Sequence, residues 1–362
     1  MKVIAQLKLH PTPDQAAALD LTLTTANAAW TYISDVAWDH QTFKQYDLQK
    51  RVYRIVRDHY GLSAQMTVRC VAKVGDAYKL NTQTKRTFKP HGASAYDSRI
   101  LSFRPADQTV SIWTMHGRIR VPFVGGARQW AYLRYQQGES DLVCHKGTWY
   151  LLATCDLPDP DEQEVDGVLG VDLGITNLAV DSDGHVHTGD HIEQQRQWYA
   201  TRRQRLQQVG TKSTKRRLKK LAGRQRRFQR DINHCISKHL VAKAQGTRRA
   251  LALEDLKHIR QRTEHTVRHT QRSRHSNWAF AQLRQFLTYK ARMVGIPVYL
   301  VDAAYTSQTC CVCGFVSRDN RKSQSLFWCG SCGASHHADS NAAGNIAYRA
   351  ACHTAYGFQF SD

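Results

Sequence analysis

Three acidic residues, each at the edge of an apolar segment, limit what this chain can fold into. Asp172 follows the apolar run VLGV, Glu254 ends the run LALE, and Asp339 precedes the small-residue segment SNAAGNI. A carboxylate beside buried apolar residues is costly unless it is paired, hydrogen-bonded or bound to a metal ion. The three segments resemble, in order, a strand with a hairpin, a second buried strand and a helix start. This order predicts a sheet domain that brings the carboxylates together.

Convergence of the three carboxylates would create a site for divalent cations. Mg²⁺ prefers oxygen ligands, and two such ions can clamp the attacking and leaving oxygens of a phosphodiester. Strand alternation puts Leu251 and Leu253 on one face and Glu254 on the other, so we choose Glu254 over Asp255 as the ligand. We also expect Ser340 to cap the last helix. A lone acid of this kind is more often a cap or an ion-pair partner, but three together predict a metal-dependent phosphodiesterase.

Four cysteines form two CxxC pairs that are separated by fifteen residues and are each followed by glycine: Cys310, Cys313, Cys329 and Cys332. This spacing predicts a structural zinc ribbon, because four thiolates leave no open position on a tetrahedral ion. The glycines permit tight turns. Cys311 could compete as a ligand only by shortening the first pair. We expect the five other cysteines to pack as small apolar groups; they are Cys70, Cys144, Cys155, Cys235 and Cys352.

The formal net charge of +21, from 51 Lys and Arg against 30 Asp and Glu, predicts a polyanionic partner such as nucleic acid. Residues 201–230 contain thirteen Lys or Arg and no acid. Solvated helix faces usually mix both signs, so we interpret this run as a phosphate-binding helix. The contact candidates are Arg216, Arg217, Lys219, Lys220, Arg224, Arg226 and Arg227. A second basic stretch, 257–275, is interpreted as a loop over the acidic site.

The remaining pattern divides the first half of the chain into a helical part and a strand-rich part. Thr12 and Pro13 predict a helix start, and helical spacing continues to about residue 85. Aromatic residues there could stack on bases, although such spacing is more often core: Trp30, Tyr46, Tyr53 and Tyr60. Short alternating runs then predict a small barrel over 96–158, from RILSFRP, TVSIWTM, RIRVPFV, AYLRY and TWYLLATCDLP. The strand before Pro11 could complete this barrel, and PDPDEQEVDG is interpreted as a linker.

Nothing in the sequence predicts a membrane protein or a secreted one. No apolar run approaches the roughly 20 residues of a membrane span, and the opening segment MKVIAQLKLHPTPDQ is too polar for a secretory signal. The CxxC pairs fit metal binding under reducing conditions better than a disulfide framework. We therefore expect the protein to work in the cytosol.

With these motifs in view, the chain resembles the TnpB family, transposon-encoded RNA-guided nucleases regarded as ancestral to type V CRISPR effectors. The resemblance rests on GVDLGITNLAV, LALEDL, NWAFAQLRQFLTYKARMVGIPVYLVDAAYTSQTCCVCG and FWCGSCGASHHADSNAAGNI. It implies a multidomain α+β fold with an RNase H-like (RuvC) α/β nuclease domain over 166–308 and 337–362. A zinc ribbon over 309–336 would interrupt that domain. Residues 1–10 and 89–165 would form a wedge-like β-barrel, and 13–88 a helical recognition domain.

The resemblance also implies a function for the whole chain. Asp172, Glu254 and Asp339 match the family's catalytic triad and would bind Mg²⁺. The partners would be a guide RNA (omega RNA) from the protein's own element and a double-stranded DNA target beside a short motif. Base pairing would then read the DNA sequence. Three alternatives stay open: a non-cleaving RNA-guided regulator, a protein-only transposase or resolvase, and a small type V CRISPR effector. The oligomeric state also stays open, with one chain per RNA expected.

Overall fold

The computed structural model describes all residues except 175, 256–279, 324 and 356–362, and it separates into two compact units, Met1–Pro158 and Asp159–Asp362. The second basic stretch, 257–275, lies outside the described residues. No helix among the described residues is long and apolar enough to cross a membrane.

The first unit combines three helices with a seven-stranded sheet. The helices are α1 (Pro13–Asp39), α2 (Gln45–Tyr60) and α3 (Ala64–Leu80). The strands are β1 (Lys2–Leu9), β2 (Ser94–Tyr96), β3 (Leu101–Arg104), β4 (Thr109–Thr114), β5 (Gly117–Val124), β6 (Gln136–His145) and β7 (Thr148–Asp156). Their order is β2-β6-β7-β1-β5-β4-β3, in a near-barrel sheet. The first strand pairs with β5 and β7, which confirms that it joins this sheet.

The start of α1 follows the sequence signals closely. The Thr12 hydroxyl accepts a hydrogen bond from the Gln15 backbone, the Gln15 side chain answers at the Thr12 backbone, and Pro13 occupies the first turn. This reciprocal capping box confirms the predicted helix start. Trp30 of α1 is 2% exposed and belongs to the hydrophobic core, so the stacking hypothesis is wrong for this residue. The same core joins all three helices to the sheet.

One predicted strand of the first unit is wrong. The segment AYLRY was expected to be extended, but its first residues lie in helix α4 (Ala127–Leu133). Apolar alternation over five residues cannot distinguish a strand from one turn of a helix. Here Trp130 stacks on Phe123 at 5.2 Å between ring centroids and Leu133 is buried, so the packing of a helical face decides the conformation.

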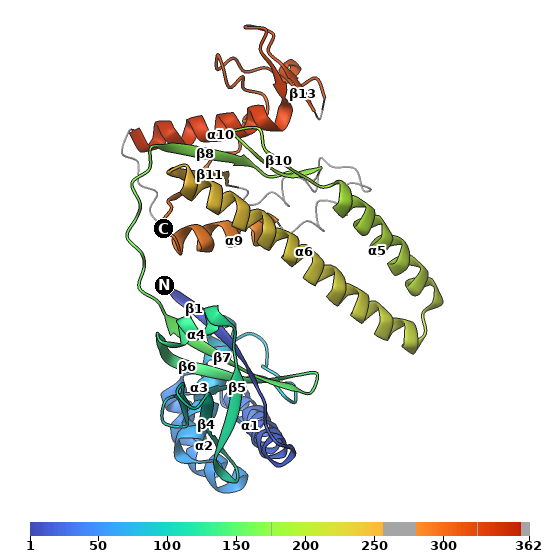
Figure 1. Ribbon diagram of the computed structural model, residues 1–362. Helices are drawn as coiled ribbons and strands as arrows, with labels where there is room; N and C mark the ends of the chain where they lie inside the picture. Colours follow the sequence, from blue (N-terminus) through green and yellow to red (C-terminus); the bar gives the residue numbers. More distant parts are fainter. Residues whose placement is uncertain (175, 256–279, 324, 356–362) are drawn as a thin grey trace. The chain divides into compact units, whose positions relative to one another are not determined.

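The second unit has a five-stranded sheet at its centre. Its strands are β8 (Gly167–Asp172), β9 (Asn177–Asp181), β10 (Val186–Thr188), β11 (Arg249–Glu254) and β12 (Val298–Val301), in the order β10-β9-β8-β11-β12. Strand β9 forms the expected hairpin with β8, while β11 runs parallel to β8 and β12. Helices α6 (Lys212–Gly246) and α9 (Phe280–Arg292) cover one face of the sheet, and α10 (Ala338–Ala355) covers the other (Figure 1).

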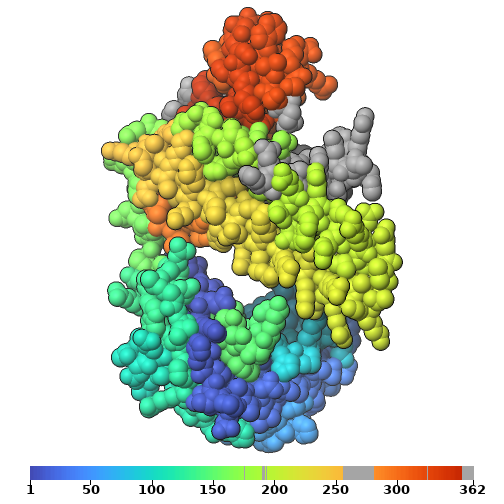
Figure 2. All heavy atoms as spheres, turned by 45° about the vertical axis from the view of Figure 1, so that its right-hand side comes forward, coloured from blue at the N-terminus to red at the C-terminus, as the bar shows by residue number. Residues whose placement is uncertain are grey.

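A helical hairpin carries the basic run. Helix α5 (Asp190–Val209) ends at Gly210, whose positive φ of 67° closes the helix, and the Thr211 hydroxyl accepts a hydrogen bond from Thr214 to start α6. The sequence predicted a helix here but not the turn that divides it in two. The yellow-green and yellow atoms of α5 and α6 form a projecting arm in Figure 2.

Between α9 and α10 the chain forms a small cysteine-bearing module with the hairpin β13 (Leu326–Trp328) and β14 (Ser335–His337). Together these parts give the multidomain α+β fold that was expected, with a four-cysteine cluster set into the second unit. The division of the first unit into recognition and wedge parts stays a prediction.

Candidate functional site

Strand register brings Asp172 and Glu254 to the same level. In the parallel pair β8 and β11, Ala252 lies beside Gly170 and Leu253 beside Val171, so the two acids end neighbouring strands together. Val171 and Leu253 pack into the core under α6 and α9. Side chains alternate along a strand, and the two acids therefore face the side that α10 covers.

Helix α10 reaches this face because Gly170 has no side chain. A Cβ at Gly170 would lie 2.1 Å from the carbonyl oxygen of Ala343 and 2.6 Å from the amide nitrogen of Ala347. The small residues of α10 thus pack directly on β8, as the sequence predicted. Asp339 precedes Ala343 by four residues and lies on the same side of the helix, which turns it toward the strand ends.

Asp339 lies in the first turn of α10, and the predicted cap of this helix is wrong. The helix begins at Ala338, so Asp339 and Ser340 are both inside it and Ser340 is not its N-cap. The backbone amide of Asp339 donates instead to Nδ1 of His337, at 3.3 Å. This contact gives His337, which precedes the helix, a position beside the site.

Polar neighbours hold the carboxylates in place. Asp339 is 4% exposed and accepts hydrogen bonds from Asn177, at 2.8 Å, and from Arg321, at 3.2 Å. Thr306 donates its hydroxyl to Glu254. These three partners, Asn177, Arg321 and Thr306, were not predicted from the sequence. Of these three, only Asn177 carried a local signal, because it begins the second strand of the predicted hairpin.

The electrostatics of the site oppose the presence of three negative charges. Burial, and then the charges of Glu254 and Asp339, raise the pKa of Asp172 to about 8, while Arg321 acts in the opposite direction. Burial also raises the pKa of Glu254, and the hydrogen bond from Thr306 lowers it. A carboxylate cluster of this kind gains from a bound cation. Asp255, the rejected alternative to Glu254, forms an ion pair with Arg284 of α9 at 2.9 Å.

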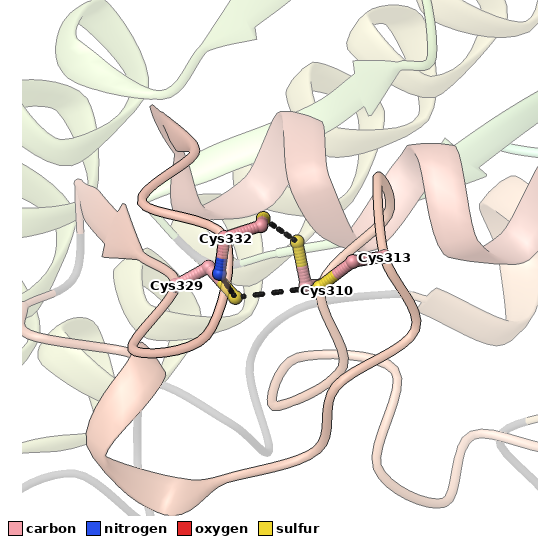
Figure 3. Close-up of side chains that lie close together, drawn as sticks. All are labelled: Cys310, Cys313, Cys329 and Cys332. Atoms are coloured by element: carbon pink, nitrogen blue, oxygen red, sulfur yellow. Dashed lines mark hydrogen bonds between the residues drawn. The ribbon is translucent and has the colours of Figure 1, made fainter.

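The four cysteines of the CxxC pairs converge on one point (Figure 3). Sγ of Cys310 lies 3.7 Å from Sγ of Cys332, and Sγ of Cys313 lies 3.5 Å from Sγ of Cys329. Four thiolates about 2.3 Å from a tetrahedral ion stand roughly 3.8 Å apart, so these side chains fit a metal site. Each following glycine has a positive φ, 76° at Gly314 and 72° at Gly333.

The remaining cysteines divide by burial. Cys70 and Cys155 are buried, as expected for small apolar groups, and Cys144 and Cys352 are partly exposed. Cys235 is exposed, so the prediction is wrong for this residue. It lies on the outer side of α6, where the sequence offered no means of separating it from the buried face.

The seven basic candidates lie on α6, and all seven are exposed: Arg216, Arg217, Lys219, Lys220, Arg224, Arg226 and Arg227. The apolar contacts between α5 and α6 involve other residues, including Tyr199 and Phe228, whose ring centroids are 6.4 Å apart. Because packing uses these residues, the cationic side chains are left in solvent.

Comparison with known proteins gives these sites a context. A family model described as a probable transposase matches residues 153–260, which include Asp172 and Glu254. A model described as the TNB domain of Cas12f1-like proteins matches residues 280–346, which include all four cysteines and Asp339. Over these two segments the chain is similar to transposase and Cas12f1-like proteins.

Three individual proteins are also similar to this chain. The CRISPR-associated endodeoxyribonuclease Cas12f1 of Sulfoacidibacillus thermotolerans is 29% identical over 59% of this chain and 53% of its own length. A TnpB-like protein of Methanocaldococcus jannaschii is 33% identical over 32% of this chain and 40% of its own length. This chain therefore spans about half the length of the curated relatives it matches. A solved CRISPR-Cas12f ternary complex is similar with a TM-score of 0.44 and 14% identity, covering 91% of this chain and 81% of the other.

Proposed function

We propose that this protein is an RNA-guided DNA endonuclease that hydrolyses phosphodiester bonds at Asp172, Glu254 and Asp339. One observation carries the proposal: two buried strand ends and one helix start present three carboxylates on a single face of a sheet. Such an arrangement is costly for the fold unless cations are bound there. The same cost raises the pKa of Asp172 to about 8, because burial and the neighbouring carboxylates disfavour its charged form.

Mg²⁺ is the ion that we propose for this site. The three acids offer hard oxygen donors, which suit Mg²⁺ better than zinc or copper. Among the described residues, two groups of side chains have ligand atoms that all lie within 4.8 Å of one another, and these groups consist of cysteines or of histidines. The oxygen atoms of the three carboxylates are therefore more widely spaced than the ligand atoms of those groups. A wider set suits two ions about 3.5–4 Å apart, which stabilise the attacking and leaving oxygens of a phosphodiester.

Zn²⁺ is the ion that we propose for Cys310, Cys313, Cys329 and Cys332. A closed set of four thiolates serves structure rather than catalysis. The segment between the two pairs supplies Arg321, which donates to Asp339 at 3.2 Å. Zinc binding would therefore also support the acidic site, because it would fix the segment that carries this arginine.

The proposed partners are a guide RNA and a double-stranded DNA target beside a short motif. Support comes from the net charge of +21, from the exposed basic residues of α6, and from relatives named as RNA-guided DNA endonucleases. Within this proposal, residues 1–10 and 89–165 form the wedge part, 13–88 the recognition part, 166–308 and 337–362 the nuclease part, and 309–336 the zinc ribbon. The protein would act in the cytosol.

A protein-only transposase is the second candidate, because the family model over 153–260 is described as a probable transposase. The two candidates differ in their need for RNA. We would express the protein with its native flanking locus, purify it and sequence the bound RNA. A discrete RNA with a constant scaffold and a variable 3′ segment supports guided targeting. Absence of a discrete RNA, together with DNA cleavage that survives ribonuclease, would establish the protein-only candidate.

The basic surface of α6 has a separate test. Replacing Arg216, Arg217, Arg226 and Arg227 with glutamine should weaken nucleic-acid binding. Each lost phosphate contact should flatten the dependence of log K on log salt by about 0.7 to 0.9. The matched control replaces the same four residues with lysine and keeps the charge, so it should keep the slope. An unchanged slope in the glutamine variant would show that these residues form a solvated helix face without phosphate contacts.

A further inference from the structure

Three histidines gather at the edge of the second sheet, away from the acidic and cysteine sets. His185 lies in the turn before β10, His187 lies in β10, and His239 lies on α6. One ring nitrogen from each lies within 4.8 Å of the other two. The closest pair, Nε2 of His187 and Nδ1 of His239, is 3.3 Å apart.

The backbone that carries His185 is held firmly. Asp181 is fully buried, and one of its carboxylate oxygens accepts hydrogen bonds from the backbone amides of Asp183, at 3.1 Å, and His185, at 3.0 Å. Its other oxygen accepts from Lys243 at 2.6 Å. This turn therefore presents His185 in a defined place, and strand alternation puts His187 on the same side two residues later.

The nearby acids are already neutralised. Asp183 forms a two-point ion pair with Arg249, at 2.7 and 2.6 Å, and a further pair with Lys243, at 2.9 Å. Asp181 is also bound to Lys243. These carboxylates are satisfied by cations from α6 and β11. Among the side chains that the structure describes at this edge, the donors left to a ligand are the three imidazoles.

We propose that His185, His187 and His239 form a second metal site, one that binds a borderline divalent cation of the zinc class. Imidazole nitrogens prefer such ions to Mg²⁺. Two nitrogens bound about 2.0–2.1 Å from a tetrahedral ion stand roughly 3.3–3.4 Å apart, which matches the separation of His187 and His239. His185 and His239 are exposed, so water can complete the coordination.

The ion would connect two elements that are far apart in the sequence. It would tie the strand β10, which leads into α5, to the C-terminal third of α6. These elements form the base of the helical hairpin that carries the basic run (Figure 1). The inference does not rest on the proposed nuclease activity, since the histidines share no residue with the carboxylate set.

The test counts zinc in the full-length, tag-free protein with its cysteine site intact. The protein is equilibrated with excess zinc, separated from free ion and measured for zinc per chain by mass spectrometry. We expect two equivalents in the wild type and one in both His187→Asn and His239→Asn. His145→Asn changes an exposed histidine of the first unit and should keep two. One equivalent in the wild type, or two in every variant, would overturn the site.

A spectroscopic measurement on the wild type covers the case in which a variant fails to fold. Cobalt added to protein that holds zinc at its cysteines should give the visible bands of nitrogen-ligated Co²⁺. The strong sulfur-to-cobalt charge-transfer band should be absent. No visible band at saturating cobalt would mean that the three rings only pack against one another and share a hydrogen bond, and the proposal would be wrong.

Discussion

Replacing Gly170 with alanine tests the contact that brings α10 to the sheet. The added Cβ would meet the carbonyl oxygen of Ala343 at 2.1 Å, which is 1.3 Å short of the 3.4 Å where ordinary contact begins. It would also meet the amide nitrogen of Ala347 at 2.6 Å. Both are backbone atoms, so no side-chain rotation relieves the clash and the helix itself must move by about 1 Å.

Two consequences follow from that movement. Overpacking of this kind costs about 1–3 kcal/mol of the free energy of unfolding, and backbone atoms favour the upper end. Asp339 would also move away from Asp172, and a displacement of about 1 Å in a catalytic site can cost roughly 10²-fold in rate. Urea unfolding and magnesium-dependent DNA cleavage measure the two effects separately.

The matched control is Gly246→Ala at the end of α6, where an added Cβ meets nothing within 4 Å. This variant should keep both the unfolding midpoint and the cleavage rate. If Gly170→Ala also keeps both, α10 does not pack on β8 as described, and the explanation for the position of Asp339 fails.

Three further predictions concern metal binding and protonation. Cys310→Ser should lose one zinc per chain and lower the melting temperature, whereas Cys311→Ser should keep both; retained zinc in Cys310→Ser would refute the ribbon. A carboxyl whose pKa rises from 3.8 to about 8 on folding destabilises the folded protein as pH rises through that range. Asp172→Asn should therefore stabilise magnesium-free protein increasingly from pH 4 to 8 in urea titrations; a pH-independent difference would contradict this. Thr306→Val removes a donor that lowers the pKa of Glu254. This variant should shift the acid limb of the pH–rate profile to higher pH, whereas Thr306→Ser should not. An unshifted limb would show that the hydrogen bond has no role in activity.

The carboxylate site was largely predictable because it follows from strand parity and helix periodicity. The alternation of Leu251, Ala252, Leu253 and Glu254 determines which residues face α10. The register of β11 with β8 then places Glu254 beside Asp172. The CxxC spacing was equally informative, since four thiolates within a short segment have few structural alternatives.

The site residues that were not predicted have a common physical cause, because each depends on a contact between distant segments. Thr306 and Arg321 reach the acids only after the chain has folded, and no local pattern distinguishes them from other polar residues. His185 and His187 show a spacing of two, typical of one strand face, but His239 comes from a helix more than fifty residues later. Gly210 is a residue type that often ends a helix, but the basic residues on both sides of it favoured the prediction of a single helix.

Cleavage of DNA by the protein with its co-purified RNA tests the central claim most directly. A linear target that carries the guide complement beside the proper motif is compared with a scrambled target, with and without Mg²⁺. We expect cleavage of the matched target only, only with Mg²⁺, and loss of cleavage in Asp339→Asn while DNA binding is kept. Cleavage that persists in Asp339→Asn, or that ignores the guide sequence, would contradict the account.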